Sequence, residues 1–127
     1  MIKDNTKRIL IVDDSNKQRQ LLSSTLRIKG FDVDVAEGGF HSIHLLEKKD
    51  FDLIVLDKEM EDMSGTEVLI LIRSKEKFKS IPILVISTDG SESNILEAID
   101  HGANDYCIKS TNLNTFLNKV NNLIGQK

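Results

Sequence analysis

The sequence predicts an α/β protein with a parallel sheet, because apolar runs of strand length alternate with segments of helical period. Five such strand and helix units can be drawn along the 127 residues. The third apolar run, Leu53 to Leu56, is unbroken, as is typical of a central strand buried on both faces. The length suits one domain with a real core. We therefore expect a single domain over residues 1–127, with its core at about residues 7–125.

The first unit pairs a strand at Arg8 to Val12 with a helix that begins near Ser15. Ser15 suits the N-cap, since a serine hydroxyl can accept a hydrogen bond from a free N–H of the first turn. Leu22 and Leu26 are spaced to share one face of this helix. Gly30 suits the end of the helix, where a left-handed residue commonly follows.

The second unit begins with Asp32 to Ala36, where polar and apolar residues alternate as they do in an edge strand. The Gly38-Gly39 pair predicts a loop before a short helix. We expect this helix to turn three apolar side chains inward, namely those of Phe40, Ile43 and Leu46.

The two central strands are joined by a helix at about Gly65 to Ser74. Its sequence "EVLILI" is apolar on more than one face, so we expect the helix to be well covered. The fourth strand, "ILVIS", follows Pro82, which stands where a missing N–H is tolerated.

The end of the chain predicts a helix at about Ser91 to Asp100, a short fifth strand "DYCIK" and a last helix. Ile95, Leu96 and Ile99 are the apolar residues of the first of these helices. In the last helix an apolar stripe of 3.6-residue period lies beneath an Asn-rich outer face. The stripe consists of Leu113, Phe116, Leu117, Val120 and Ile124.

Composition excludes several classes of function. The net charge is −3, the basic residues are scattered and the chain lacks Trp, so we expect no nucleic-acid binding. No apolar run approaches the roughly 18 residues of a membrane span, and we expect no membrane contact. The single Cys107 has no partner for a disulfide or a metal site, which indicates a reducing, cytoplasmic setting and a thiol in the core.

Polar residues follow four of the predicted strands at their carboxyl ends, where open α/β sheets place their sites. Two unit charges ~4 Å apart at an effective dielectric of about 20 interact by roughly 4 kcal/mol, so carboxylates gathered there need a cation. A lysine supplies one positive charge, and Mg²⁺ suits the rest because it prefers oxygen ligands. These strand-end residues are Asp13, Asp14, Asp57, Ser87, Thr88 and Lys109.

Four motifs in this order carry a family resemblance: "ILIVDDS", "LIVLDKEMEDMSG", "ILVIST" and "HGANDYCIKS". Together they resemble the receiver domain of two-component response regulators, and chemotaxis regulators in particular. The resemblance implies a flavodoxin-like (βα)5 fold, with a sheet of order 2-1-3-4-5 and helices on both faces. It also implies that Asp57 is the phosphoacceptor, held at the mouth of a buried strand.

The resemblance further implies a role for each residue of the site. It makes Asp14 and Asp57 direct Mg²⁺ ligands, with Asp13 acting through water and the main-chain carbonyl of Glu59 as a further ligand. Lys109 and the Ser87 hydroxyl would bind phosphoryl oxygens. Tyr106 would turn inward when Ser87 moves, and the fourth helix, fifth strand and fifth helix would form the output face.

Three residues depart from the pattern of the family, and two more are expected to affect how long the phosphoryl group survives. Ser110 replaces the usual proline after Lys109, and since a non-proline cis bond costs ~3–4 kcal/mol we expect a trans bond there. Glu61 also replaces a proline and should loosen its loop, while Thr88 should narrow access to Asp57. Glu59 and Asp89 should face each other across the site and tune the phosphoryl lifetime.

The function that follows is a receiver that takes a phosphoryl group from a sensor histidine kinase or a histidine phosphotransfer protein, as a monomer or weak dimer. It would be no enzyme beyond Mg²⁺-dependent phosphotransfer and autodephosphorylation. The alternative is a phosphorylation-independent protein-interaction module on the same fold. The sequence does not identify the downstream protein partner in either case. A phosphatase is disfavoured because Glu59, and not Asp, stands two residues after Asp57. His41 and His44 are expected to be surface residues, since no third metal ligand lies nearby.

Overall fold

The five strands form one parallel sheet in the order β2-β1-β3-β4-β5. The computed structural model describes residues 5–125. The strands are β1 (Arg8–Val12), β2 (Asp32–Ala36), β3 (Leu53–Asp57), β4 (Ile83–Ser87) and β5 (Asp105–Ile108). The helices are α1 (Asn16–Ile28), α2 (Gly39–Lys48), α3 (Gly65–Ser74), α4 (Glu92–Asp100) and α5 (Leu113–Leu123), with a short 3₁₀ turn at Glu76–Phe78. The predicted flavodoxin-like architecture and strand order are confirmed.

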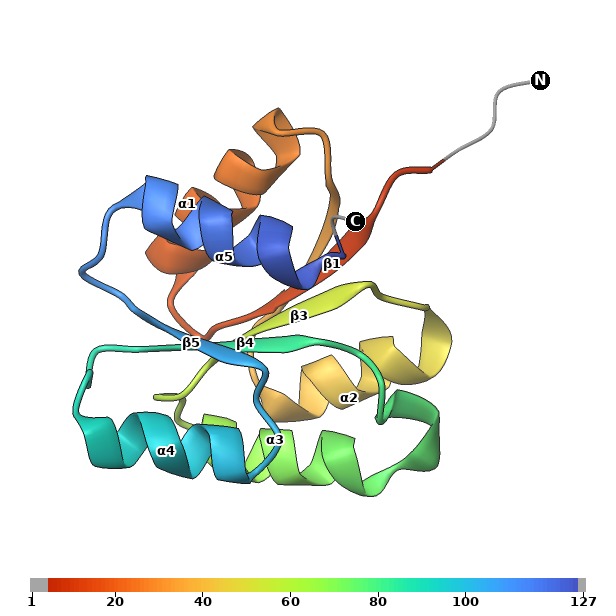
Figure 1. Ribbon diagram of the computed structural model, residues 1–127. Coiled ribbons are helices and arrows are strands. Elements are labelled where there is room, and N and C mark those ends of the chain that lie inside the picture. The colour runs from red at the N-terminus through yellow and green to blue at the C-terminus, as the bar shows by residue number, and fades with distance from the viewer. Residues whose placement is uncertain (1–4, 126–127) are drawn as a thin grey trace.

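Helices cover both faces of the sheet, as Figure 1 shows. The pair α1 and α5 lies on one face, and α2, α3 and α4 lie on the other. The sheet therefore separates two hydrophobic cores, because successive side chains of a strand point to opposite faces. Ile9, Val55 and Phe116 belong to the α1 and α5 side, and Leu10, Ile54 and Ile72 to the opposite side. Cys107 is buried in the first of these cores, as predicted.

Serine and asparagine side chains fix where helices begin. Ser15 accepts a hydrogen bond from the Gln18 N–H, which confirms it as the N-cap of α1. Ser64 and Glu67 form a reciprocal capping box at the start of α3. Ser91 is the N-cap of α4 and accepts a hydrogen bond from the Asn94 N–H, so that helix begins at Glu92, one residue after the predicted start.

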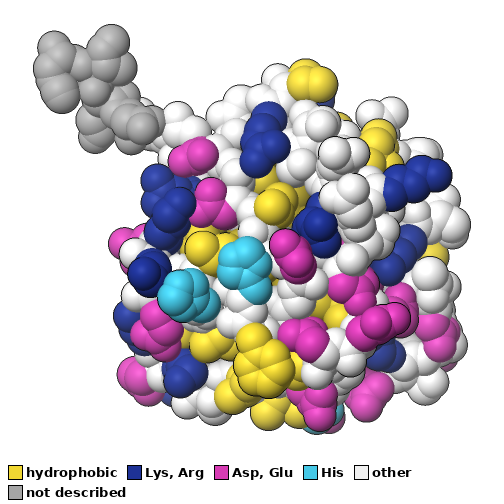
Figure 2. Space-filling model, turned by 180° about the vertical axis from the view of Figure 1, so that it is seen from behind, with side chains coloured by type: hydrophobic (Ala, Val, Ile, Leu, Met, Phe, Trp, Pro, Cys, Tyr) yellow, Lys and Arg dark blue, Asp and Glu magenta, His cyan; other side chains and the backbone are white. Residues whose placement is uncertain are grey.

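Some apolar side chains are more exposed than the sequence pattern predicted. Phe40 is 67% exposed, so the prediction that it points inward is wrong, although Leu46 is buried. Ile70 and Leu71 of α3 are also exposed, because the helix covers the sheet with one face only. Phe40, Ile70 and Leu71 share a shallow groove with Met63. Seen from behind in Figure 2, hydrophobic side chains gather at the lower edge of the molecule beside acidic ones.

Two element boundaries differ from the predicted ones. The third strand runs one residue further and includes Asp57, whereas the fifth ends at Ile108 and leaves Lys109 in the following loop. Residues 5–125 contain no cis peptide bond, so the bond before Ser110 is trans, as predicted. None of the helices in that range has the length and hydropathy needed to cross a membrane.

Gly65 lets the chain fold back closely onto the end of β3. Its N–H donates to the carbonyl of Lys58 at 2.9 Å. A Cβ at this position would lie 2.3 Å from the Asp57 carbonyl oxygen and 2.5 Å from the Lys58 Cα. Both of these are backbone atoms, which cannot rotate away. The loop after Asp57 is therefore packed tightly at its end, despite the expectation that Glu61 would loosen it.

We predict that Gly65→Ala lowers the free energy of unfolding by about 1–3 kcal/mol, the usual cost of overpacking. Gly90→Ala is the matched control, because its Cβ would meet the flexible tip of Ile108 and not the backbone. Urea denaturation of both variants checks this. Equal losses of stability would contradict the close backbone approach at Gly65.

Candidate functional site

Three carboxylates meet at the carboxyl ends of β1 and β3. Asp13, Asp14 and Asp57 each offer an oxygen atom, and these atoms all lie within 4.8 Å of one another. Asp13 and Asp57 are 0% and 1% exposed, while Asp14 is exposed. The sequence placed these residues at strand ends, and the adjacent pairing of β1 with β3 brings them together.

Backbone and arginine contacts fix the acidic cluster in place. One oxygen of Asp13 accepts from the Ser15 N–H at 2.9 Å, and its carbonyl accepts from the Arg19 guanidinium at 2.8 Å. The Asp14 carboxylate accepts from the Glu61 N–H at 2.9 Å. This last bond ties the loop after Asp57 to the opposite side of the cluster.

Two oxygen atoms of the cluster are left without a partner. Asp13 Oδ2 and Asp57 Oδ2 are buried, and neither has a hydrogen-bond partner among the described residues. A buried carboxylate oxygen without a donor is costly, and a bound cation would satisfy both. Three carboxylates at one edge are the oxygen ligands that Mg²⁺ prefers. The residues present therefore fit a magnesium ion.

Lys109 supplies the positive charge of the site. Its ammonium lies 2.8 Å from Asp57 Oδ1 and 3.5 Å from Glu59 Oε1. Burial works against a charged lysine, but the Asp57, Asp13 and Glu59 carboxylates outweigh it and raise the pKa of Lys109. Burial also raises the pKa of Asp57 to about 7; the Lys109 ammonium opposes this and the Asp13 carboxylate adds to it.

Glu59 occupies the space between Lys109 and the end of β4. Ser87 is 0% exposed and donates its hydroxyl to Glu59 Oε2 at 2.5 Å. The Thr88 N–H donates to Glu59 Oε1 at 3.2 Å. Burial acts to raise the pKa of Glu59, but the bonds from Ser87 and Thr88 and the Lys109 ammonium prevail and lower it. Glu59 is thus an ionised acceptor for three donors.

Tyr106 and Asp89 lie on the far side of Ser87. Tyr106 is 5% exposed and donates its hydroxyl to the Asp89 carbonyl at 2.6 Å. The Asp89 carboxylate accepts from the Ser91 N–H and the Asn94 amide at the start of α4. The expectation that Asp89 and Glu59 face each other is therefore not met, because the Asp89 side chain turns to the helix.

Sequence reasoning missed the residues that connect the site to its surroundings. Arg19 holds the Asp13 carbonyl, and Asp62 accepts from the N–H groups of Gly39 and Phe40 at the start of α2. Lys58 donates to Asn94 of α4. An acidic residue opposite a helix start is favoured by the helix dipole, but nothing in the local sequence of Asp62 tells which helix it meets.

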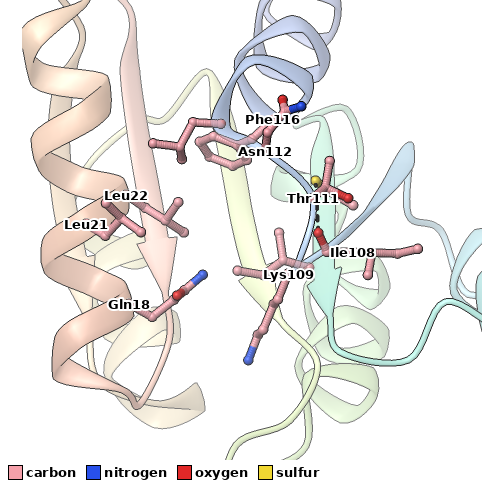
Figure 3. Close-up of a pocket in the computed structure, with 11 residues that line it drawn as sticks. Gln18, Leu21, Leu22, Ile108, Lys109, Thr111, Asn112 and Phe116 are labelled. Carbon is pink, nitrogen blue, oxygen red and sulfur yellow. Dashed lines mark hydrogen bonds between the residues drawn. The ribbon is translucent and has the colours of Figure 1, made fainter.

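A separate hollow of about 190 Å³ lies beside the site, between α1 and the start of α5. Figure 3 shows Leu21 and Leu22 of α1 on one side and Asn112 and Phe116 on the other. The Lys109 stem lines the hollow and its amino group extends away from the apolar end. The hollow therefore packs the lysine stem and holds none of the carboxylates.

Comparisons with known proteins agree on one family. The chain matches the model of the response regulator receiver domain over residues 9–121. It is 34% identical to the chemotaxis protein CheY-3 of Vibrio cholerae over 117 residues, which cover 91% of this chain and 90% of that protein.

Solved structures give the same result. The chemotaxis response regulator CheY4 of Vibrio cholerae has a TM-score of 0.89 and 31% identity, covering 94% of this chain and 99% of that one. The response regulator TrrA of Thermotoga maritima, solved in complex with Mg²⁺–BeF, has a TM-score of 0.83 and 34% identity, covering 93% and 99%. With its parallel sheet of order 2-1-3-4-5 and its acidic strand ends, the chain belongs to the response regulator receiver domain family.

Proposed function

We propose that Asp57 accepts a phosphoryl group from the phosphohistidine of a sensor histidine kinase or a histidine phosphotransfer protein. The observation that carries this is Asp57 Oδ2, a buried carboxylate oxygen with no hydrogen-bond partner among residues 5–125, beside the Lys109 ammonium. In the transfer, this carboxylate forms an O–P bond while the N–P bond to the donor histidine breaks. The imidazole nitrogen leaves with the electron pair.

The acidic cluster would hold the metal that this transfer uses. Asp14 and Asp57 would be direct ligands, with Asp13 acting through water and the Glu59 carbonyl completing the protein's share. When bound, Mg²⁺ supplies positive charge beside the transferred oxygens. Support comes from the two unpartnered carboxylate oxygens and from the Mg²⁺–BeF complex of TrrA.

The other polar groups would bind the phosphoryl oxygens. Lys109 already contacts Asp57, so its ammonium would lie beside the negatively charged oxygens of a phosphoryl group on that residue. The Ser87 hydroxyl, at the end of the neighbouring strand, would donate to a second oxygen. These contacts would hold the aspartyl phosphate until water removes it, so that autodephosphorylation ends the signal and no other reaction is catalysed.

The output would pass through the face formed by α4, β5 and α5. Tyr106 of β5 is bonded to the Asp89 carbonyl in the loop before α4, which links this face to the loop that follows Ser87. Leu96 and Ile99 of α4 are 59% and 44% exposed and offer apolar contact to a protein partner. Phosphorylation would change the charge at Asp57, and a local change of charge can bias a segment that has two stable arrangements. The partner would bind one arrangement of this face in preference to the other.

A second candidate function is a phosphorylation-independent interaction module. The observation that favours it is that the Ser87 and Tyr106 hydroxyls are already buried and bonded, with Glu59 accepting from Ser87 and the Asp89 carbonyl accepting from Tyr106. Partner binding that is indifferent to Mg²⁺ and to Asp57→Asn would support the module. A partner bound only by the phosphorylated protein would exclude it.

We predict that acetyl phosphate labels the wild type in the presence of Mg²⁺ and leaves Asp57→Asn unlabelled. Chelation of Mg²⁺ by EDTA should abolish labelling of the wild type. Asp50→Asn is the charge-matched control, since this exposed carboxylate lies outside the site, and it should label fully. Labelling is measured as the gain in mass of the protein or as incorporated radiolabel that is stable in acid. Equal labelling of wild type and Asp57→Asn would end the proposal.

A second prediction concerns stability without metal. Since burial raises the pKa of Asp57 to about 7 from 3.8, its contribution to stability is fully present below pH about 4 and is lost as the pH rises through about 7. In EDTA at pH 8, Asp57→Asn should therefore be more stable than the wild type by roughly 2–4 kcal/mol. The gap should close near pH 4 and shrink when Mg²⁺ is added.

Urea denaturation at pH 4, 6 and 8 measures this difference. Asp50→Asn should follow the wild type at each pH. A gap between wild type and Asp57→Asn that is independent of pH would refute the electrostatic account.

A further inference from the structure

The Glu59 carboxylate faces three donors beside the end of β4. Ser87 Oγ lies 2.5 Å from Oε2, and the Thr88 nitrogen lies 3.2 Å from Oε1. The Lys109 ammonium lies 3.5 Å from the same Oε1. Both carboxylate oxygens are therefore engaged, although the side chain comes from an exposed position in the loop after β3.

One of these donors, the Lys109 ammonium, also contacts Asp57. Lys109 binds Asp57 Oδ1 at 2.8 Å, and the Glu59 N–H donates to the same oxygen at 3.1 Å. A phosphoryl on Asp57 would bring roughly −1.5 to −2 units of charge and three acceptor oxygens into this space. It would need the donors that Glu59 now holds, and its charge would repel the Glu59 carboxylate. The two anions therefore compete for one set of partners.

The contact with Glu59 continues to Tyr106 through a short chain of hydrogen bonds. The Ser87 oxygen that donates to Glu59 also accepts from the Asp89 N–H at 3.0 Å. The Asp89 carbonyl in turn accepts from the Tyr106 hydroxyl at 2.6 Å. Ser87 and Tyr106 are both buried, so this chain of hydrogen bonds connects the Glu59 carboxylate to an inward Tyr106.

We propose that the Glu59 carboxylate is an internal occupant of the phosphoryl-oxygen site, which holds Ser87, Thr88 and Lys109 until a phosphoryl on Asp57 displaces it. The inference rests on the proposed function and adds a competitor to it. The Glu59 carboxylate acts by positioning these three donors and takes no part in the transfer itself. Two consequences follow: Glu59 weakens the binding of a phosphoryl group, and it keeps Tyr106 inward in the unphosphorylated protein.

Tyr106 is a convenient reporter, because the chain contains one Tyr and no Trp. Its fluorescence and its quenching by neutral acrylamide therefore report on this one side chain. Three variants separate contact from charge. Glu59→Gln removes the charge, Glu59→Asp keeps the charge but withdraws it by one methylene, and Glu61→Gln removes a charge from an exposed side chain in the same loop.

In the metal-free protein without phosphoryl analogue, Glu59→Gln and Glu59→Asp should increase acrylamide quenching of Tyr106 at least twofold, while Glu61→Gln matches the wild type. With Mg²⁺ present, the beryllofluoride concentration at the midpoint of the titration should fall three- to tenfold in Glu59→Gln relative to the wild type. Saturating beryllofluoride should then protect Tyr106 equally in all variants, because the analogue provides the acceptor that Glu59 had supplied.

The outcomes separate this inference from the proposed function. If wild type and Asp57→Asn respond identically to Mg²⁺ and beryllofluoride, the proposed function fails and the inference fails with it. If only the wild type responds, but both Glu59 variants match it in quenching and in midpoint, the proposed function stands and the inference is wrong. A lower midpoint that Glu61→Gln reproduces, with unchanged quenching, also overturns the inference, since it reflects net charge alone.

Discussion

The ion pair between Lys109 and Asp57 is the interaction on which the site depends. Asp57 is 1% exposed, and removing a carboxylate from water costs several kcal/mol unless a partner compensates it. The partner comes from the loop after β5, although β4 lies between β3 and β5 in the sheet. The lysine must therefore reach across the end of β4, where Ser87 lies. One electrostatic requirement thus places the acid, the ammonium and the hydroxyl in the same space.

The loop from Lys58 to Ser64 carries the effects of this pair to the rest of the fold. It is bonded to Asp14 through the Glu61 N–H and to the start of α2 through Asp62. Lys58 reaches α4 through Asn94, and Gly65 packs the end of the loop against the Asp57 carbonyl. A change of charge at Asp57 would therefore act on a segment that has fixed contacts with α2, with α4 and with Asp14.

The sequence predicts the sheet and the acidic cluster well, and for the same physical reason. Buried strands need continuous apolar runs, and the carboxyl ends of parallel strands meet at one edge, so residues 13, 57, 87 and 109 follow from strand boundaries alone. Phe40 was misplaced because a ten-residue helix with several apolar residues does not reveal which of them covers the sheet. The partners of Glu59 and Asp89 were missed because a flexible exposed side chain has many rotamers, and its choice depends on residues far away in sequence.

The buried Ser87 hydroxyl suggests how the fold can switch at low energetic cost. A hydroxyl that is 0% exposed cannot turn to water, so it needs an acceptor in every state. Glu59 provides that acceptor before phosphorylation and the phosphoryl group would provide it afterwards. The number of hydrogen bonds at Ser87 is then unchanged, and the two states differ mainly in which anion is bound. Because an exchange of partners costs less than the loss of one, the free-energy difference between the two states would be small enough for a single phosphoryl group to shift their populations.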